Sequence, residues 1–184
     1  MNYKISIALI LLIGFIGAGF LVAQIGNEIS YFHIDYAVDV TDDRALVGIA
    51  DNVFIGKVIA QTGNKPNTPR PEAGDVSGFS PQTQFSVEIL ENIKGNLTGT
   101  ITVSQYGGYE RKIIVVKQLV LGVGDKLLEP DKTYLFITGY NDINRWHTII
   151  APSYGNLLIA NQTDHRNKLE RFITAFAQEI SPEE

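Results

Sequence analysis

Short segments in which apolar and polar residues alternate occur between residues 84 and 106. A period of two places the apolar side chains of a segment on one face, which is typical of a strand in a half-buried sheet. The segments 84–90 and 100–106 show this alternation. The almost continuously apolar run 112–122 and the segment 132–139, which follows a turn at residues 129–131, also predict strands. Many short antiparallel strands joined by turns indicate a sandwich or a barrel.

Further elements flank this series. The composition predicts additional short strands at 29–38, 52–61, 146–152 and 156–161. Gly56 interrupts the second of these, and a glycine inside a strand favours a bulge or a bend. Thr41, Asp42 and Asp43 supply a cap and first-turn acids, which predict a short helix ending near Ala50.

The C-terminal segment 163–180 has a helical period instead. A stripe of apolar residues with spacings of three and four faces a charged opposite side, and it consists of Leu169, Phe172, Ile173, Phe176 and Ile180. Thr163 or Asp164 is the expected N-cap. We expect this amphipathic helix to cover one opening of the sheet structure.

The N-terminal segment 5–25 contains no charged residue. A helix of this length crosses about 30 Å of hydrocarbon. Lys4 precedes the segment and Glu28 follows it, a charge bias that places the N-terminus in the cytoplasm and the body outside. Residues 1–26 are therefore expected to be a membrane anchor, or a signal peptide cleaved near Ala23. Either alternative makes residues 27–184 an extracytoplasmic domain, held to the cell membrane by a single pass or secreted.

The composition excludes several classes of function. The chain has no cysteine, so disulfides, thiolate zinc sites and iron–sulfur clusters are ruled out, and we expect no cofactor. Its formal net charge is −5 and it contains no run of basic residues. Proteins that bind nucleic acid neutralise phosphates with lysine and arginine, so nucleic acid is not an expected partner.

Gly107-Gly108 is the most conspicuous local motif. Glycines that cradle a phosphate stand between a strand and a helix, where amide groups converge on the anion. Here a second predicted strand follows the glycine pair, so the motif predicts a turn between strands. The flanking Tyr106 and Tyr109 suit a recognition edge, since tyrosine is favoured in binding contacts.

Residues 62–84 are rich in proline and glycine, which predicts a long exposed loop. Loops of this length are either functional or mobile, and the sequence leaves both alternatives open. If the loop binds a ligand, Arg70 and Phe79 are its candidate contact residues.

No catalytic motif accompanies these features. The three histidines, His33, His147 and His165, fall on different predicted elements and lack the spacing of a metal site, so no metal ligands are predicted. The chain also lacks the Gly-x-Ser-x-Gly, Ser-x-x-Lys and His-Glu-x-x-His patterns. An enzyme would need a site assembled from scattered residues.

Four segments occur in an order that resembles a known group of proteins: "ADNVFIGKV", "TQFSVEILENIKG", "ITVSQYGG" and "LLEPDKTYLFI". This order, over about residues 45–140, is similar to that of exported prokaryotic proteins of unassigned function. It also resembles netrin-type modules and tissue inhibitors of metalloproteinases. The resemblance implies a mainly β fold, a small antiparallel Greek-key barrel of OB-like type. The inhibitors act through an N-terminal cysteine that this chain lacks, so protease inhibition does not carry over.

These features together predict a non-enzymatic binding module outside the cytoplasm. Its expected ligand is a protein, a peptide or a cell-envelope component such as a glycan, and the alternative is a cell-envelope hydrolase. The candidate binding residues are Arg70, Phe79, Tyr106, Gly107, Gly108 and Tyr109.

Overall fold

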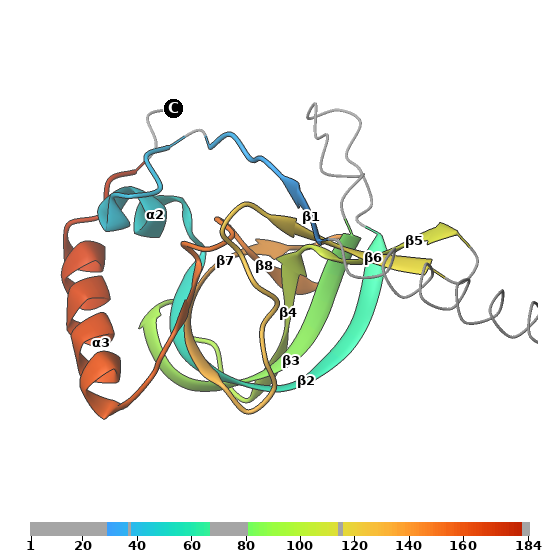
Figure 1. The fold of residues 1–184 in the computed structure, drawn as a ribbon. Helices are drawn as coiled ribbons and strands as arrows, with labels where there is room; N and C mark the ends of the chain where they lie inside the picture. The colour runs from blue at the N-terminus through green and yellow to red at the C-terminus, as the bar shows by residue number, and fades with distance from the viewer. Residues whose placement is uncertain (1–28, 37, 67–80, 114–115, 182–184) are drawn as a thin grey trace, which may run out of the picture.

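The computed structural model describes residues 29–36, 38–66, 81–113 and 116–181 (Figure 1). In chain order its elements are β1 (Ile29–Phe32), α2 (Asp43–Ile49), β2 (Asn52–Pro66), β3 (Pro81–Lys94), β4 (Thr100–Tyr106), β5 (Gly108–Ile113), β6 (Val116–Gly122), β7 (Thr133–Asn141), β8 (Trp146–Ile149), β9 (Asn156–Leu158) and α3 (Gln162–Ala177). The predictions of a mainly β protein and of a C-terminal helix are confirmed.

Five strands of the larger sheet form a closed ring. The sheet order is β2-β3-β4-β8-β7-β9, and β2 pairs with β7 as well as with β3 (Figure 1). The closing contact runs antiparallel from the pair Asn52–Thr138 to the pair Lys57–Thr133. Closure removes the free edges of these strands over the paired stretch, and free edges are the aggregation-prone part of an open sheet.

The expectation of a wholly antiparallel sheet is wrong for two pairs. β4 and β8 run parallel, with Val103 beside His147, and β1 and β6 also run parallel. The first case follows from the ring itself. Strand directions cannot alternate all the way round a ring of five members, so at least one neighbouring pair must be parallel.

Two predicted segments have different boundaries in the structure. The run 112–122 is not one strand, because β5 and β6 form an antiparallel pair in a separate three-stranded sheet with β1. The predicted loop 62–84 is shorter, because β2 continues to Pro66 and β3 begins at Pro81. Pro66 and Pro81 stand at strand ends, where a missing backbone N–H is tolerated.

Alternate residues of the ring strands enter two hydrophobic clusters. Phe54, Phe85 and Phe136 belong to the cluster inside the ring, where Phe54 and Phe136 stack with ring centroids 5.2 Å apart. Residues on the opposite faces of β2 and β7, such as Ile55 and Ile137, pack with α2 and α3. The C-terminal helix therefore covers the wall of the ring formed by β2 and β7 and not one of its openings.

The N-terminus of α3 also differs from the prediction. Asn161 is the N-cap, and its Oδ1 accepts hydrogen bonds from the backbone N–H groups of Thr163 and Asp164 at 3.0 Å. Asparagine is as good a cap as the two residues that we expected, so the sequence alone does not separate the three positions. Phe172 is fully buried, whereas Ile173 is 50% exposed.

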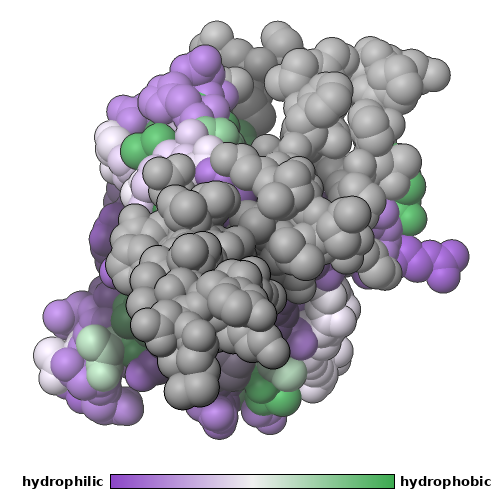
Figure 2. All heavy atoms as spheres, turned by 45° about the vertical axis from the view of Figure 1, so that its right-hand side comes forward, coloured by the Kyte–Doolittle hydropathy of each residue, from purple (hydrophilic) through white to green (hydrophobic). Residues whose placement is uncertain are grey.

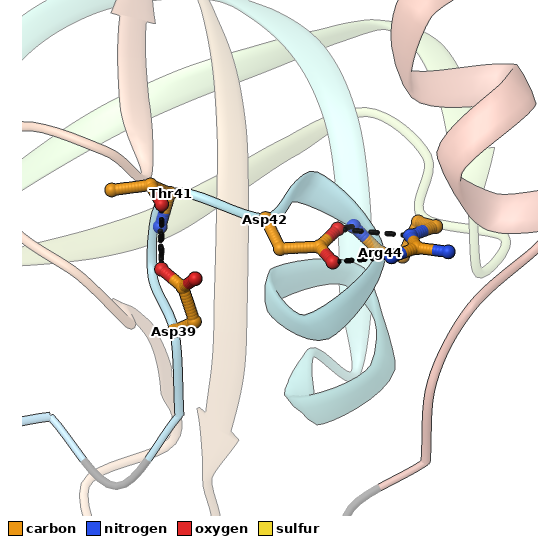
Figure 3. A network of polar contacts seen from close by, with 4 residues as sticks. All are labelled: Asp39, Thr41, Asp42 and Arg44. Atoms are coloured by element: carbon orange, nitrogen blue, oxygen red, sulfur yellow. Dashed lines mark hydrogen bonds and ion pairs between the residues drawn. The ribbon is translucent and has the colours of Figure 1, made fainter.

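The short helix α2 forms where it was predicted, with Asp42 as its N-cap (Figure 3). The Asp42 carboxylate accepts from the backbone N–H of Arg44 at 2.9 Å and binds the Arg44 guanidinium at 2.6 Å. Just before the helix, Asp39 accepts from the Thr41 hydroxyl at 2.6 Å. The hydrogen bonds from Arg44 lower the pKa of Asp42 to about 2.

This low pKa predicts a loss of stability in acid. Asp42 is ionised in the folded chain down to about pH 2, whereas an unfolded aspartate has a pKa of about 3.9. The contribution of the ionised Asp42 carboxylate to the free energy of unfolding is therefore complete above about pH 4. This contribution disappears as the pH falls through the pKa of Asp42 in the folded chain. Urea midpoints of wild type and Asp42→Asn should converge as the pH is lowered from about 6 to about 2. A difference in midpoint that does not change with pH would contradict this assignment.

Candidate functional site

The outer surface of β3, β4 and β8 carries a group of polar side chains. In the strand register Gln84 lies beside Ser104, and Ser104 lies beside Thr148. Residues two positions apart on a strand share a face, so Gln82 and Trp146 belong to the same surface. The alternate residues Phe85, Val103 and Ile149 point into the ring. We call this surface the polar face, and its members are Gln82, Gln84, Ser104, Trp146 and Thr148.

Most of the polar face is shielded from solvent. Gln82 is 1% exposed, Gln84 3% and Ser104 0%. The Ser104 hydroxyl donates to Gln82 Oε1 at 3.0 Å, and Gln84 Nε2 donates to the backbone oxygen of Gln82 at 3.1 Å. These hydrogen bonds fix the orientation of the two amide side chains.

Two buried polar atoms of this face have no hydrogen-bond partner. They are the acceptor Oε1 of Gln84 and the donor Nε1 of Trp146. Buried side-chain polar atoms are nearly always hydrogen-bonded, because leaving one unpaired costs about 1–3 kcal/mol. The polar face therefore contains one buried acceptor and one buried donor without a hydrogen-bond partner.

The glycine pair lies at the end of β4 beside this face. Gly107 and Gly108 have φ values of +108° and +148°, which only glycine adopts readily. The chain here leaves the five-stranded ring and enters β5 of the smaller sheet. The backbone N–H of Gly107 donates to Pro81 at 2.7 Å, and the Thr83 hydroxyl donates to Gly107 O at 2.8 Å. The prediction that a strand and not a helix follows the glycine pair is confirmed, and the connection is a corner between two sheets because β4 and β5 belong to different sheets.

The structure places the predicted binding residues in three different situations. Tyr106 shares the face of Ser104 by strand alternation and so adjoins the polar face. Tyr109 lies beyond the corner on β5, is 51% exposed, and its backbone oxygen accepts from Asn64 Nδ2 at 2.9 Å. Arg70 and Phe79 lie outside the described residues.

The members of the polar face were not predicted from the sequence. The alternation of Gln82 and Gln84 with Phe85 was visible, but it resembles an ordinary solvent-facing side of a strand. Burial and the unpaired atoms distinguish this face from a solvent-facing side of a strand. Both properties arise only when β3, β4 and β8, which are distant in sequence, are assembled into one sheet. Trp146 belongs to a residue type that often marks binding surfaces, as tyrosine does, and it was not selected from the sequence.

A second buried polar group lies on the inner side of β4. Gln105 Nε2 donates to Asp125 Oδ2 at 2.8 Å and to the backbone oxygen of Lys126 at 2.7 Å, while Gln105 Oε1 accepts from Leu128 N at 3.0 Å. Asp125 Oδ1 in turn accepts from Asn156 Nδ2 at 3.0 Å. These bonds attach the segment before β7 to the ring. Burial, and then the charge of Asp125, raise the pKa of Tyr36.

His147 is the buried histidine of the described chain. It is 8% exposed, its ring lies 5.1 Å from that of Tyr140, and its Nδ1 has no partner. Burial lowers its pKa, opposed by the charge of Asp51, so it is neutral near pH 7. Among the described residues no three His, Asp or Glu side chains are grouped so that they could hold a metal ion. The hydrolase alternative remains a prediction.

No model of a known protein family matches the chain, and no curated protein matches it. The described helices, α2 and α3, are each too short or too polar to span a bilayer, and the candidate span 5–25 lies outside the described residues. Function is therefore inferred from the geometry of the polar face.

Proposed function

We propose that this protein is an extracytoplasmic, non-enzymatic binding module that takes a neutral, hydroxyl-rich ligand of the cell envelope, a glycan, on its polar face. The observation that carries the proposal is the pair of buried atoms without partners, Gln84 Oε1 and Trp146 Nε1. A sugar hydroxyl both donates and accepts, so one ligand class satisfies both atoms.

The chemistry of the polar face supports an uncharged ligand. Its members contribute amide, hydroxyl and indole groups and no ionisable side chain. A charged ligand would lose hydration at this face without gaining a counter-charge from it. Because the unpaired atoms are buried, hydrogen bonds to them form in a medium of low dielectric constant and are strengthened. Ligand entry then needs a local opening, which slows association.

The strand order supports an OB-like Greek-key barrel as the carrier of this face. Along the chain the ring strands are β2, β3, β4, β7 and β8, so β7 is the fourth and β2 is the first. In space β7 lies beside β2 in the order β7-β2-β3-β4, which is the Greek-key arrangement. Barrels of the OB type bind oligosaccharides and oligonucleotides along their second and third strands and the adjoining loops. Those two strands of the ring are β3 and β4, which carry Gln84 and Ser104.

The proposed location follows from the sequence. Residues 5–25 hold the domain at the outer side of the cell membrane, or they are removed near Ala23 and the domain is secreted. An envelope glycan is within reach in either case. Tyr106, which adjoins the polar face, extends the contact surface toward the glycine corner.

The proposal is tested with the full chain in detergent and with chitotriose as the probe, by calorimetry. Trp146→Phe keeps an aromatic ring but removes the indole N–H, and Gln84→Ala removes the acceptor. Each loses a neutral hydrogen bond of about 0.5–1.5 kcal/mol, so the dissociation constant should rise by about 2- to 12-fold.

Gln61→Ala is the matched control, because Gln61 is an exposed glutamine on the neighbouring strand β2 and its loss should leave affinity unchanged. Equal affinity of all three variants and wild type would contradict the proposed site. Binding of a mixed peptide library with no binding of chitotriose would reassign the ligand to peptides.

A further inference from the structure

An apolar groove of about 570 Å³ lies between β1, β6 and the segment that follows β6. We call it the β1 groove. Its apolar lining consists of Ile29, Tyr31, Leu119, Leu121, Val123 and Leu127. Three of these side chains are largely open to solvent, since Ile29 is 46% exposed, Tyr31 56% and Val123 59%.

Two of the exposed residues, Ile29 and Tyr31, come from one side of β1, and Val123 follows β6. Ile29 and Tyr31 alternate with Ser30 and Phe32, and the Phe32 ring is turned toward Gly122. Elsewhere, hydrophilic residues cover most of the described surface in the view of Figure 2, with hydrophobic residues in small separate patches. Contiguous exposed apolar side chains on a polar protein mark a contact with another apolar phase or partner.

We propose that the β1 groove rests on the surface of the lipid bilayer. This inference depends on the proposed membrane anchor. The apolar segment 5–25 ends four residues before Ile29, and a fully extended chain spans at most about 3.6 Å per residue, so Ile29 lies within about 14 Å of the end of that segment. Once the segment inserts, the groove cannot be far from the lipid headgroups.

The groove has the chemistry of the bilayer interface. Tyr31 combines an apolar ring with a polar tip, a residue type that concentrates at the headgroup level. The exposed Lys126 at the rim can extend its ammonium toward lipid phosphates while its stem follows apolar surface. The nearby Asp125 is 5% exposed and accepts from Gln105 and Asn156, so its charge is turned away from the rim. The contact holds the domain in one orientation on the membrane.

The chain contains no cysteine, so one introduced cysteine can be labelled uniquely. A spin label at Val123→Cys, in the full chain in nanodiscs of zwitterionic and anionic lipid, reports the contact. Collisions with oxygen, which concentrates in lipid, should exceed collisions with a water-soluble nickel complex. A label at Ile173→Cys on α3, 50% exposed, should show the opposite ratio. Tyr31→Asp should move the Val123 label toward water.

The outcomes separate the groove from the anchor. A water-exposed label at Val123→Cys, on a chain that resists carbonate extraction, would overturn the groove contact and leave the anchor standing. Release of the chain by carbonate would overturn both. A label shielded from both reagents, with a short distance between labels on two chains, would show that a second copy covers the groove and would also overturn the proposal.

Discussion

Replacing Gly107 with alanine should destabilise the fold by about 3 kcal/mol. The added Cβ would stand 2.8 Å from the backbone oxygen of Val120 and 3.0 Å from a methyl group of Leu121. A backbone oxygen cannot rotate away as a flexible side chain can, and the φ of +108° is strained for any other residue. The corner that joins the ring to the smaller sheet would have to shift. The loss of stability is measured as a lower urea midpoint, with an unchanged slope of the free energy of unfolding against urea concentration.

Gly99 provides a matched control for this substitution. It also has a positive φ, +69°, but nothing lies within 4 Å of its added Cβ. Gly99→Ala should therefore show only the backbone penalty, about 1 kcal/mol. Gly107→Ala and Gly99→Ala variants of equal stability would contradict the tight packing of the corner at Gly107.

Gln105→Leu should also lower the free energy of unfolding by about 3 kcal/mol. The substitution keeps the volume of the side chain but leaves Asp125 Oδ2 and the N–H of Leu128 without their partners. Each buried unpaired group costs about 1–3 kcal/mol, and more when it is charged. Thermal or urea unfolding of the variant and wild type measures the difference.

Two further variants show whether the loss comes from the network. Thr102→Val, at an exposed position of the same strand, should change stability by less than about 0.5 kcal/mol. The double variant Gln105→Leu/Asp125→Asn should lose less than the sum of the single variants, because the two residues share one hydrogen bond. A Gln105→Leu variant within experimental error of wild type would contradict the role of this network.

Local patterns in the sequence predict the elements that depend on local physics. The alternation around Phe85 and Val103 predicts β3 and β4, and Asp42 predicts the start of α2, because strand period and helix capping act over a few residues. The reversal between β5 and β6 was missed because the apolar run 112–122 has no glycine or proline inside it to mark a turn. A period of two does not show where a strand stops.

The candidate site was harder to predict than the strands. The parallel pairing of Val103 with His147 follows from the closure of a five-membered ring, which no local pattern contains. That pairing brings Trp146 onto the same surface as Gln84, although 62 positions separate them in the chain. Tyr106 was selected for its residue type and adjoins the site, whereas Gln84 is distinguished by burial, which only the assembled sheet determines.

The indole N–H of Trp146 tests the proposed binding face most directly. The chain has one tryptophan, so its indole gives a single signal in a proton–nitrogen correlation spectrum. Titration with chitotriose should shift this signal in a saturable manner, together with the side-chain amide of Gln84, as the unpaired donor and acceptor gain partners. An indole signal that stays in place at saturating chitotriose, while signals elsewhere on the domain move, would contradict the polar face as the binding site.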